Sequence, residues 1–328
     1  MIDMISLFVN KPNPSYINVN PQRLDLSVGP RPSWGLCDPF AGSRSCPFQS
    51  EGFLGEGPQS SPGGILKSRF HGRKVDARTL LSEAIHGERN FTDSDLSKCD
   101  LAAHPQQVEH FNKVMLDRCV PSTDVAYDEL SKGNWLNLDK YHIERLLETY
   151  DRNFQRERFY FTQANLCGFC AIGMWFPMVD LRYTYMDSAD FTECFMPGAL
   201  FDEAEGPSMV LQHTDLRKAA FHGGRFLKVN LAGSCMQGSR LIQSSFVNSN
   251  FDSANLEGTI IENTDLSGCD FSRASLLKVE GLVSATWSGA KFACTKVSPE
   301  DAKKIQTKRE LDDLDMCTPE HRALRKGR

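Results

Sequence analysis

The chain has 328 residues, 40% of them hydrophobic, and its 42 acidic and 37 basic residues give a net charge of -5 at pH 7. This length and apolar content suffice for one large or two ordinary domains with a buried core. The mild negative charge gives no general attraction to nucleic acid or anionic membranes, and no segment approaches the roughly 20 apolar residues that span a bilayer.

Residues 1–72 are rich in proline, glycine and serine and show no sustained periodicity. Such a composition is typical of a disordered segment, because it offers too little apolar surface to offset the entropy of ordering the chain. The first ten residues lack the basic region and the long apolar core of a Sec signal peptide, so export by that route is not expected.

Residues 73–121 are predicted to hold a helical cap and a first, irregular coil. Residues 75–88 have the pattern of a short helix, which would cover an open β-edge. Apolar residues then recur every five positions at Phe91, Leu96 and Leu101, and the same register can be extended to Phe111 and Leu116.

Residues 122–158 are predicted to be a helical insertion. Ile143, Leu146, Leu147, Tyr150 and Phe154 recur at steps of three and four, which places them on one face of a helix. A charged run follows over residues 152–158.

From Phe161 to Leu276 a large apolar residue stands at nearly every fifth position, and only Ala171 and Gly206 break the series. Two residues before each lies a second, mostly small column, and the residue between the two is often Asp or Asn, as at Asp190 and Asn255. A period of five fits neither a helix nor a strand, so the pattern indicates a solenoid whose coils are buried only by their neighbours.

In these residues the chain resembles the pentapeptide-repeat family, whose consensus is Ala-Asp/Asn-Leu-x-x. The resemblance implies an all-β solenoid, a right-handed quadrilateral β-helix with four pentapeptides per coil and both columns pointing inward. About six coils spaced as neighbouring strands would make a core roughly 29 Å long. After Leu276 the register slips by one residue and continues to Val297, so the β-helix is predicted over residues 159–297. Residues 298–328 are predicted to form a capping helix, begun by Ser298 and Pro299, and a basic tail.

The side chains that could carry chemistry form no convincing site. Eleven cysteines, of which Cys99, Cys194 and Cys269 fall in the small inward column, favour reduced thiols over a disulfide framework. Cys167 and Cys170 form the only CxxC, and without a second pair they are better interpreted as surface thiols than as zinc ligands. His213, His222 and Asp215 could be imagined as an acid/base cluster, but no nucleophile or oxyanion donor accompanies them. No catalytic residue, metal site or cofactor is therefore predicted.

Two segments are candidates for binding a protein partner. The apolar column fails at Gly206, which predicts a bulge that carries Glu203 and Glu205 out of the coil, and a protruding loop is a natural contact point. The helical insertion, with Arg152, Arg156 and Arg158, could be a docking surface. For both, the plainer alternative is a solvated surface segment that binds nothing.

The order of the segments resembles that of pentapeptide-repeat type III effectors of Gram-negative bacteria: a loose leader that is not cleaved, a helical cap, then the repeats. This resemblance implies a non-enzymatic secreted effector that reaches the host cytosol without a Sec signal and binds a host protein. The alternative is a DNA mimic that acts on a type II topoisomerase, a role known in the family, although a net charge of -6 over residues 161–276 is mild for such mimicry. An enzyme and a purely structural rod inside the bacterial cytoplasm also remain open.

Overall fold

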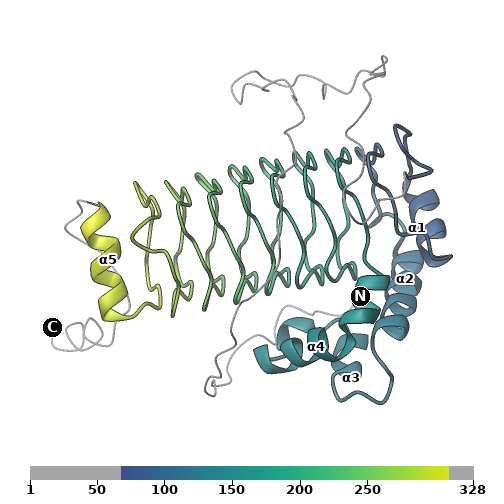
Figure 1. The fold of residues 1–328 in the computed structure, drawn as a ribbon, viewed down its shortest axis with the longest axis horizontal. Helices are drawn as coiled ribbons and strands as arrows, with labels where there is room; N and C mark the ends of the chain where they lie inside the picture. Colours follow the sequence, from purple (N-terminus) through teal and green to yellow (C-terminus); the bar gives the residue numbers. More distant parts are fainter. Residues whose placement is uncertain (1–67, 310–328) are drawn as a thin grey trace. The chain divides into compact units, whose positions relative to one another are not determined.

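The computed structural model describes residues 68–309, with side chains to residue 305, all within one compact unit of the chain. Its main body is a stack of coils in which single residues form parallel β-bridges with residues 20 positions further on (Figure 1). Since the bridged residues recur every five positions, each coil has four pentapeptides and four faces. The sequence prediction of a repeat β-helix with four pentapeptides per coil is confirmed.

Each face has a central column of outward residues, and we number the faces by these columns. The first face has Tyr160, Asp180, Leu200, Ala220, Arg240, Ile260 and Glu280. The second has Asn165, Tyr185, Glu205, Arg225, Ser245 and Asp265. The third has Cys170, Asp190, Val210, Asn230, Asn250, Asp270 and Lys291, and the fourth has Trp175, Phe195, Asp215, Cys235, Asn255 and Ser275.

The Asp and Asn residues of the central columns stabilise the corners of the coil that follow them. In Asn250, for example, Oδ1 accepts a hydrogen bond from the backbone N–H of Asp252, and Asp270 binds the N–H of Ser272 in the same way. The next residue after each such donor adopts a positive φ, as Ser253 and Arg273 do. A short acceptor that bonds two residues ahead stabilises a turn, which explains why this position prefers Asp and Asn.

The inward columns are buried as predicted, and the two breaks in the apolar column are filled from the small column. At Ala171 the small-column residue two places earlier is Phe169, which is fully buried and packs on Phe191 with ring centroids 5.6 Å apart. At Gly206 a Cβ would collide with Sδ of Met209, so the Met209 side chain occupies the space that a larger residue would fill. Both pentapeptides therefore keep the regular geometry.

The N-terminal end of the stack is covered by the helix α1 (Ala77–Ile85), capped by Asp76. The coil that follows has only three faces, because its bridges join Asn90, Asp95 and Asp100 to residues 70 positions later instead of 20. The extra residues contain α2 (Pro105–Cys119), α3 (Tyr127–Ser131), the 3₁₀ helix η1 (Trp135–Asn137) and α4 (Lys140–Arg156). These helices therefore interrupt the chain where the fourth face of the first coil is expected.

The insertion is longer than the sequence predicted. Phe111 and Leu116, which fit the five-residue register, lie on α2 and are buried as part of a helix. Pro105 at the start of this segment favours a helix N-terminus. Two apolar residues five positions apart fit both a helix and a coil, so Phe111 and Leu116 alone could not decide between these structures. The helical insertion thus begins at Pro105, within the segment 73–121 predicted to hold the helical cap and the first irregular coil.

At the other end the bridge spacing changes from 20 to 21 residues, beginning with Asp265 and Thr286. This confirms the predicted slip, and Leu282, Trp287 and Phe292 are buried in the last coil. The helix α5 (Pro299–Arg309) follows, and the hydroxyl of Ser298 caps it by accepting from the N–H of Asp301. The predicted leader up to residue 67 and the basic tail from residue 310 lie outside the described residues.

Candidate functional site

The inserted helices dock on the fourth face of the β-helix through an aromatic cluster. Trp175 and Phe195, from successive coils, stack with centroids 4.2 Å apart. The ring of Trp135, from η1, lies 6.5 Å from Trp175 and 5.8 Å from Phe195. All three side chains are buried, so this contact is a true extension of the hydrophobic core.

A buried ion pair continues this interface into the next coil. The guanidinium of Arg217 pairs with Asp215 and donates to the carbonyl oxygens of Leu138, at 2.6 Å, and Trp135, at 2.9 Å. Burial disfavours the charged guanidinium, but the carboxylate of Asp215 outweighs it and raises the pKa of Arg217. The pair therefore stays ionised and fixes the start of α4 to the coil.

The open edge of the β-ladder on the fourth face is completed by a side chain from α2. The amide of Asn112 accepts from the backbone N–H of Trp175 at 2.9 Å and donates to the carbonyl of Gly173 at 2.7 Å. One side-chain amide thus takes the place of a peptide group from the missing pentapeptide. Buried backbone groups are rarely left without a partner, which accounts for an Asn at this point of α2.

The outward side of the insertion carries the two most exposed of the large apolar side chains that the structure describes. Val125, before α3, is 79% exposed, and Tyr141, in the first turn of α4, is 66% exposed. Arg145 donates to Asp124, next to Val125, at 3.0 Å and lies one turn after Tyr141 on α4. The ion pair thus links the two segments that carry Val125 and Tyr141, and we call these four residues the insertion platform (Val125, Tyr141, Asp124 and Arg145).

The predicted binding residues are not brought together. Arg152 and Arg156 are exposed on α4, and Arg158, which follows the helix, is half-buried. Glu203 and Glu205 lie on the body of the coil, and the predicted bulge is wrong: Glu205 bridges regularly to Tyr185 and Arg225. The bulge does not form because Met209 fills the space beside Gly206. Whether any of these five residues contacts a partner stays a prediction.

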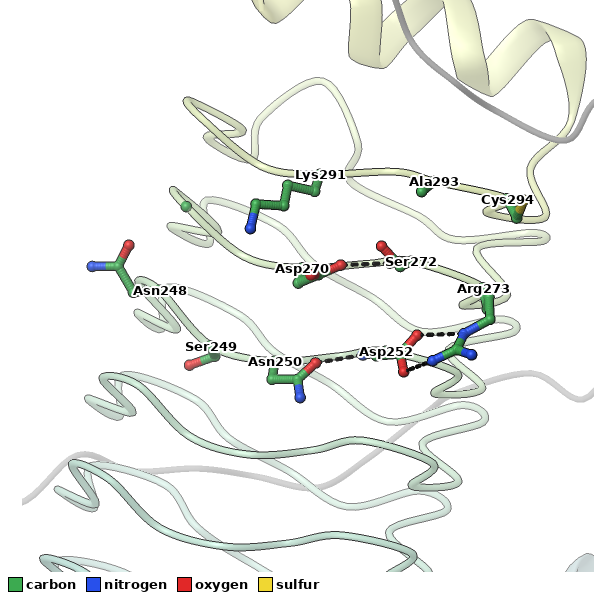
Figure 2. Close-up of a pocket in the computed structure, with 11 residues that line it drawn as sticks. Asn248, Ser249, Asn250, Asp252, Asp270, Ser272, Arg273, Lys291, Ala293 and Cys294 are labelled. Carbon is green, nitrogen blue, oxygen red and sulfur yellow. Dashed lines mark hydrogen bonds and ion pairs between the residues drawn. The ribbon is translucent and has the colours of Figure 1, made fainter.

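A polar hollow of about 610 Å³ lies on the third face near the C-terminal end of the stack (Figure 2). Asn250, Asp270 and Lys291 line it from three successive coils, and an ion pair between Asp252 and Arg273 forms its edge. The Asn and Asp oxygens are engaged in the corner turns described above. The lining residues of the hollow include no paired nucleophile and base that would indicate a catalytic site.

The other sequence candidates also have structural roles. Asp215, considered with His213 and His222, is the partner of Arg217, and His213 is exposed. Cys99, Cys194 and Cys269 are buried as predicted, and burial raises the pKa of Cys99 and of Cys269 to about 12, so these thiols stay protonated. Cys167 and Cys170 are half-buried, as outward residues of the coil.

Residues 68–309 hold neither a candidate metal cluster nor a helix of membrane-spanning character. They contain no group of three His, Cys, Asp or Glu side chains arranged to hold a metal ion. Over the same part of the chain, no helix combines the length and apolar character needed to cross a bilayer.

The fold defines the class of this protein as a repeat β-helix built from pentapeptide coils. Residues 249–279 match the family model of pentapeptide repeats, which describes eight copies, and this match supports the pentapeptide-repeat family. None of the curated proteins matches the chain.

The sequence signal for the docking of the helices, which the sequence analysis missed, is on the fourth face. There Trp175 and Phe195 replace the usual Asp or Asn of the central column.

Several solved structures are similar to parts of the chain. A trypsin-treated variant of QnrB1, a plasmid-mediated fluoroquinolone resistance protein, is 18% identical; the match covers 48% of this chain and 87% of that one, with a TM-score of 0.23. A pentapeptide repeat protein from the thylakoid lumen of Arabidopsis thaliana is also 18% identical, covering 36% and 77%, with a TM-score of 0.26. HetL of Nostoc sp. strain PCC 7120, involved in heterocyst differentiation regulation, is 15% identical over 68% and 94%, with a TM-score of 0.21. At these TM-scores the similarities carry no argument about function.

Proposed function

We propose that this protein is a non-enzymatic interaction rod, and specifically a secreted bacterial effector that uses its β-helix and docked helices to bind a host protein in the host cytosol. The observation that carries this proposal is the insertion platform. Val125 and Tyr141 are exposed although the helices around them are fixed to the coil by buried contacts. An aromatic and an aliphatic side chain held on a rigid support lose little entropy when they bind, which favours a role in recognition.

The test of binding is an affinity capture from a host-cell lysate with the full-length chain. A protein retained by the wild type should be lost when Val125→Ser and Tyr141→Ser are combined, and retained by the control Val283→Ser. Val283 is 54% exposed and lies in the last coil, away from the insertion in the sequence, so it controls for the loss of any exposed apolar side chain. Equal loss with both variants, or no retained protein, would contradict the proposed platform.

The test of secretion is separate. Residues 1–80, fused to a reporter, should be delivered into a eukaryotic cell by a type III system, and retention in the bacterium would contradict the effector half of the proposal. The leader is rich in proline and serine, as in the effectors that the chain resembles.

The alternative, DNA mimicry directed at a type II topoisomerase, needs a continuous column of free carboxylates. Three of the carboxylates in the coils are paired instead: Asp180 with Arg182, Asp215 with Arg217, and Asp252 with Arg273. A supercoiling assay with DNA gyrase decides between the two functions, since inhibition by the wild-type chain would favour the mimic and overturn the choice made here.

A further inference from the structure

Large apolar residues in the central column of the fourth face accompany its cover by the inserted helices. On the fourth face the column begins with Trp175 and Phe195, which lie beneath the insertion, and changes to Asn255 and Ser275, which are half-exposed. Of the three covered positions, two are aromatic and the third, Asp215, is the ion-pair partner of Arg217, whereas the uncovered positions are Asn and Ser.

On the first face, three of the seven central residues are aliphatic, although none of the three belongs to the packed core of the described residues. Leu200, Ala220 and Ile260 stand at positions where the repeat favours Asp or Asn, and Ile242 lies beside them at a corner. All four are half-buried, and Leu200, Ile242 and Ile260 do not belong to the apolar side chains packed against the core. We call these four residues, together with Arg240, the first-face strip.

Two polar groups on the first-face strip or next to it lack partners. Arg240 is exposed between Ala220 and Ile260, and its guanidinium forms no ion pair with the described residues. Asp202, two residues after Leu200, is 6% exposed; its Oδ1 accepts from the N–H of His222, while its Oδ2 is buried without a hydrogen-bond partner among the described residues. The Oδ2 atom of Asp202 is closed off from the surface, so an occupant of this face should bring apolar side chains and a carboxylate for Arg240.

The described part of the chain begins at the N-terminal end of this same face. The hydroxyl of Ser68 donates to the carbonyl of Asn90, at 2.6 Å, and Asn90 precedes Tyr160 in the first-face column. From Asn90 to Arg240 the column rises by five coils, about 24 Å at the spacing of neighbouring strands. Eleven extended residues upstream of Ser68 can span about 35 Å, which is enough to reach Arg240.

We propose that residues 51–56 of the chain itself dock on the first-face strip. This segment reads Glu-Gly-Phe-Leu-Gly-Glu, so Phe53 and Leu54 lie between the carboxylates of Glu51 and Glu56. Its two apolar side chains match the strip, and either carboxylate can pair with Arg240. The strip is only a few coils long, which suits a short extended segment better than a second folded protein.

Hydrogen exchange of the full-length chain, followed by mass spectrometry, tests this contact. The amides of residues 51–56 should exchange at least tenfold more slowly in the wild type than in a synthetic peptide of residues 46–60. The variant Arg240→Glu should restore the rate of the free peptide. Combining it with Glu51→Arg and Glu56→Arg should slow the exchange again, because the charges are then reversed on both sides.

The matched control is Arg225→Glu, which changes an exposed arginine in the same type of position on the second face. It should leave the protection of residues 51–56 unchanged. Exchange at the free-peptide rate in the wild type would overturn the proposal, as would equal loss of protection with Arg225→Glu. Protection that rises with protein concentration would also overturn it, because the occupant would then be a second copy of the chain. None of these results depends on host binding or secretion.

Discussion

The covered and uncovered parts of the fourth face use one column of residues for two purposes. Beneath the insertion, Trp175, Phe195 and Asp215 are buried and bind the helices. Further along, Asn255 and Ser275 are half-exposed, and Asn255 accepts from the N–H of Glu257 to hold its corner. The interior of the coil is the same in both parts. A solenoid can therefore gain a binding surface by changing outward residues, while the inward columns stay apolar and buried.

The largest effect is expected from Phe251→Asp, in the uncovered part. The ring of Phe251 stacks on Phe271 with centroids 4.8 Å apart, and a carboxylate there would be buried without a partner. Since each coil is buried only by its neighbours, we expect the β-helix to unfold, measured by circular dichroism and sedimentation. A monomeric variant that melts cooperatively like the wild type would contradict the assigned register.

A smaller but still large effect is expected from Asp215→Ala, in the covered part. It leaves the buried guanidinium of Arg217 without its carboxylate, and breaking a buried pair in this way costs about 3–5 kcal/mol. The control is Asp252→Ala, whose partner Arg273 is exposed, so the free energy of unfolding in urea should barely change. Equal effects of the two variants would show that the insertion contributes nothing to the strength of the pair.

The filled break at Gly206 predicts an effect of intermediate size. Gly206→Leu restores the repeat consensus but places its side chain where Met209 lies, and overpacking of this kind costs about 1–3 kcal/mol. Adding Met209→Ala should recover most of this loss in thermal unfolding. If the single variant were as stable as the wild type, Met209 would not be the residue that fills the gap.

Exchanging the residue types of the two parts tests the comparison directly. Asn255→Phe removes the corner hydrogen bond where no helix covers the face, and we expect a loss of about 1 kcal/mol in the free energy of unfolding. The control Asn255→Asp keeps the acceptor and should be neutral. A stabilised phenylalanine variant would mean that an uncovered apolar residue is favourable on this face.

The smallest effect is a pH dependence on the first face. Burial raises the pKa of Asp202 above its ordinary value of 3.8, so the folded protein holds this proton more tightly than the unfolded chain. Stability should therefore rise as the pH falls from the folded pKa towards 3.8, and the charged carboxylate should cost stability above that window. Asp202→Asn should remove this contribution and raise the free energy of unfolding at pH 7. An unchanged pH profile would contradict the assignment to Asp202.

Sequence reasoning was most successful where one physical rule acts on every residue. The spacing of five, the buried cysteines and the slip after Leu276 follow from repeated ladders and were all predicted correctly. It failed at Phe111 and Leu116, where two apolar residues suit both a coil and a helix, and at Gly206, where a neighbour fills the space. The insertion platform could not be found from spacing, because exposure depends on how the helices dock.

By itself, the sequence determined the class of fold and the register of the coils, since side chains that stack on their own repeats need no distant partner. The tertiary structure alone decided that the insertion replaces one face of the first coil, and that Asn112, Trp135 and Arg217 join it to the stack. Those contacts link residues about 60–80 positions apart. No local periodicity can encode such pairs, because they depend on the shapes of two surfaces that meet only after each has folded.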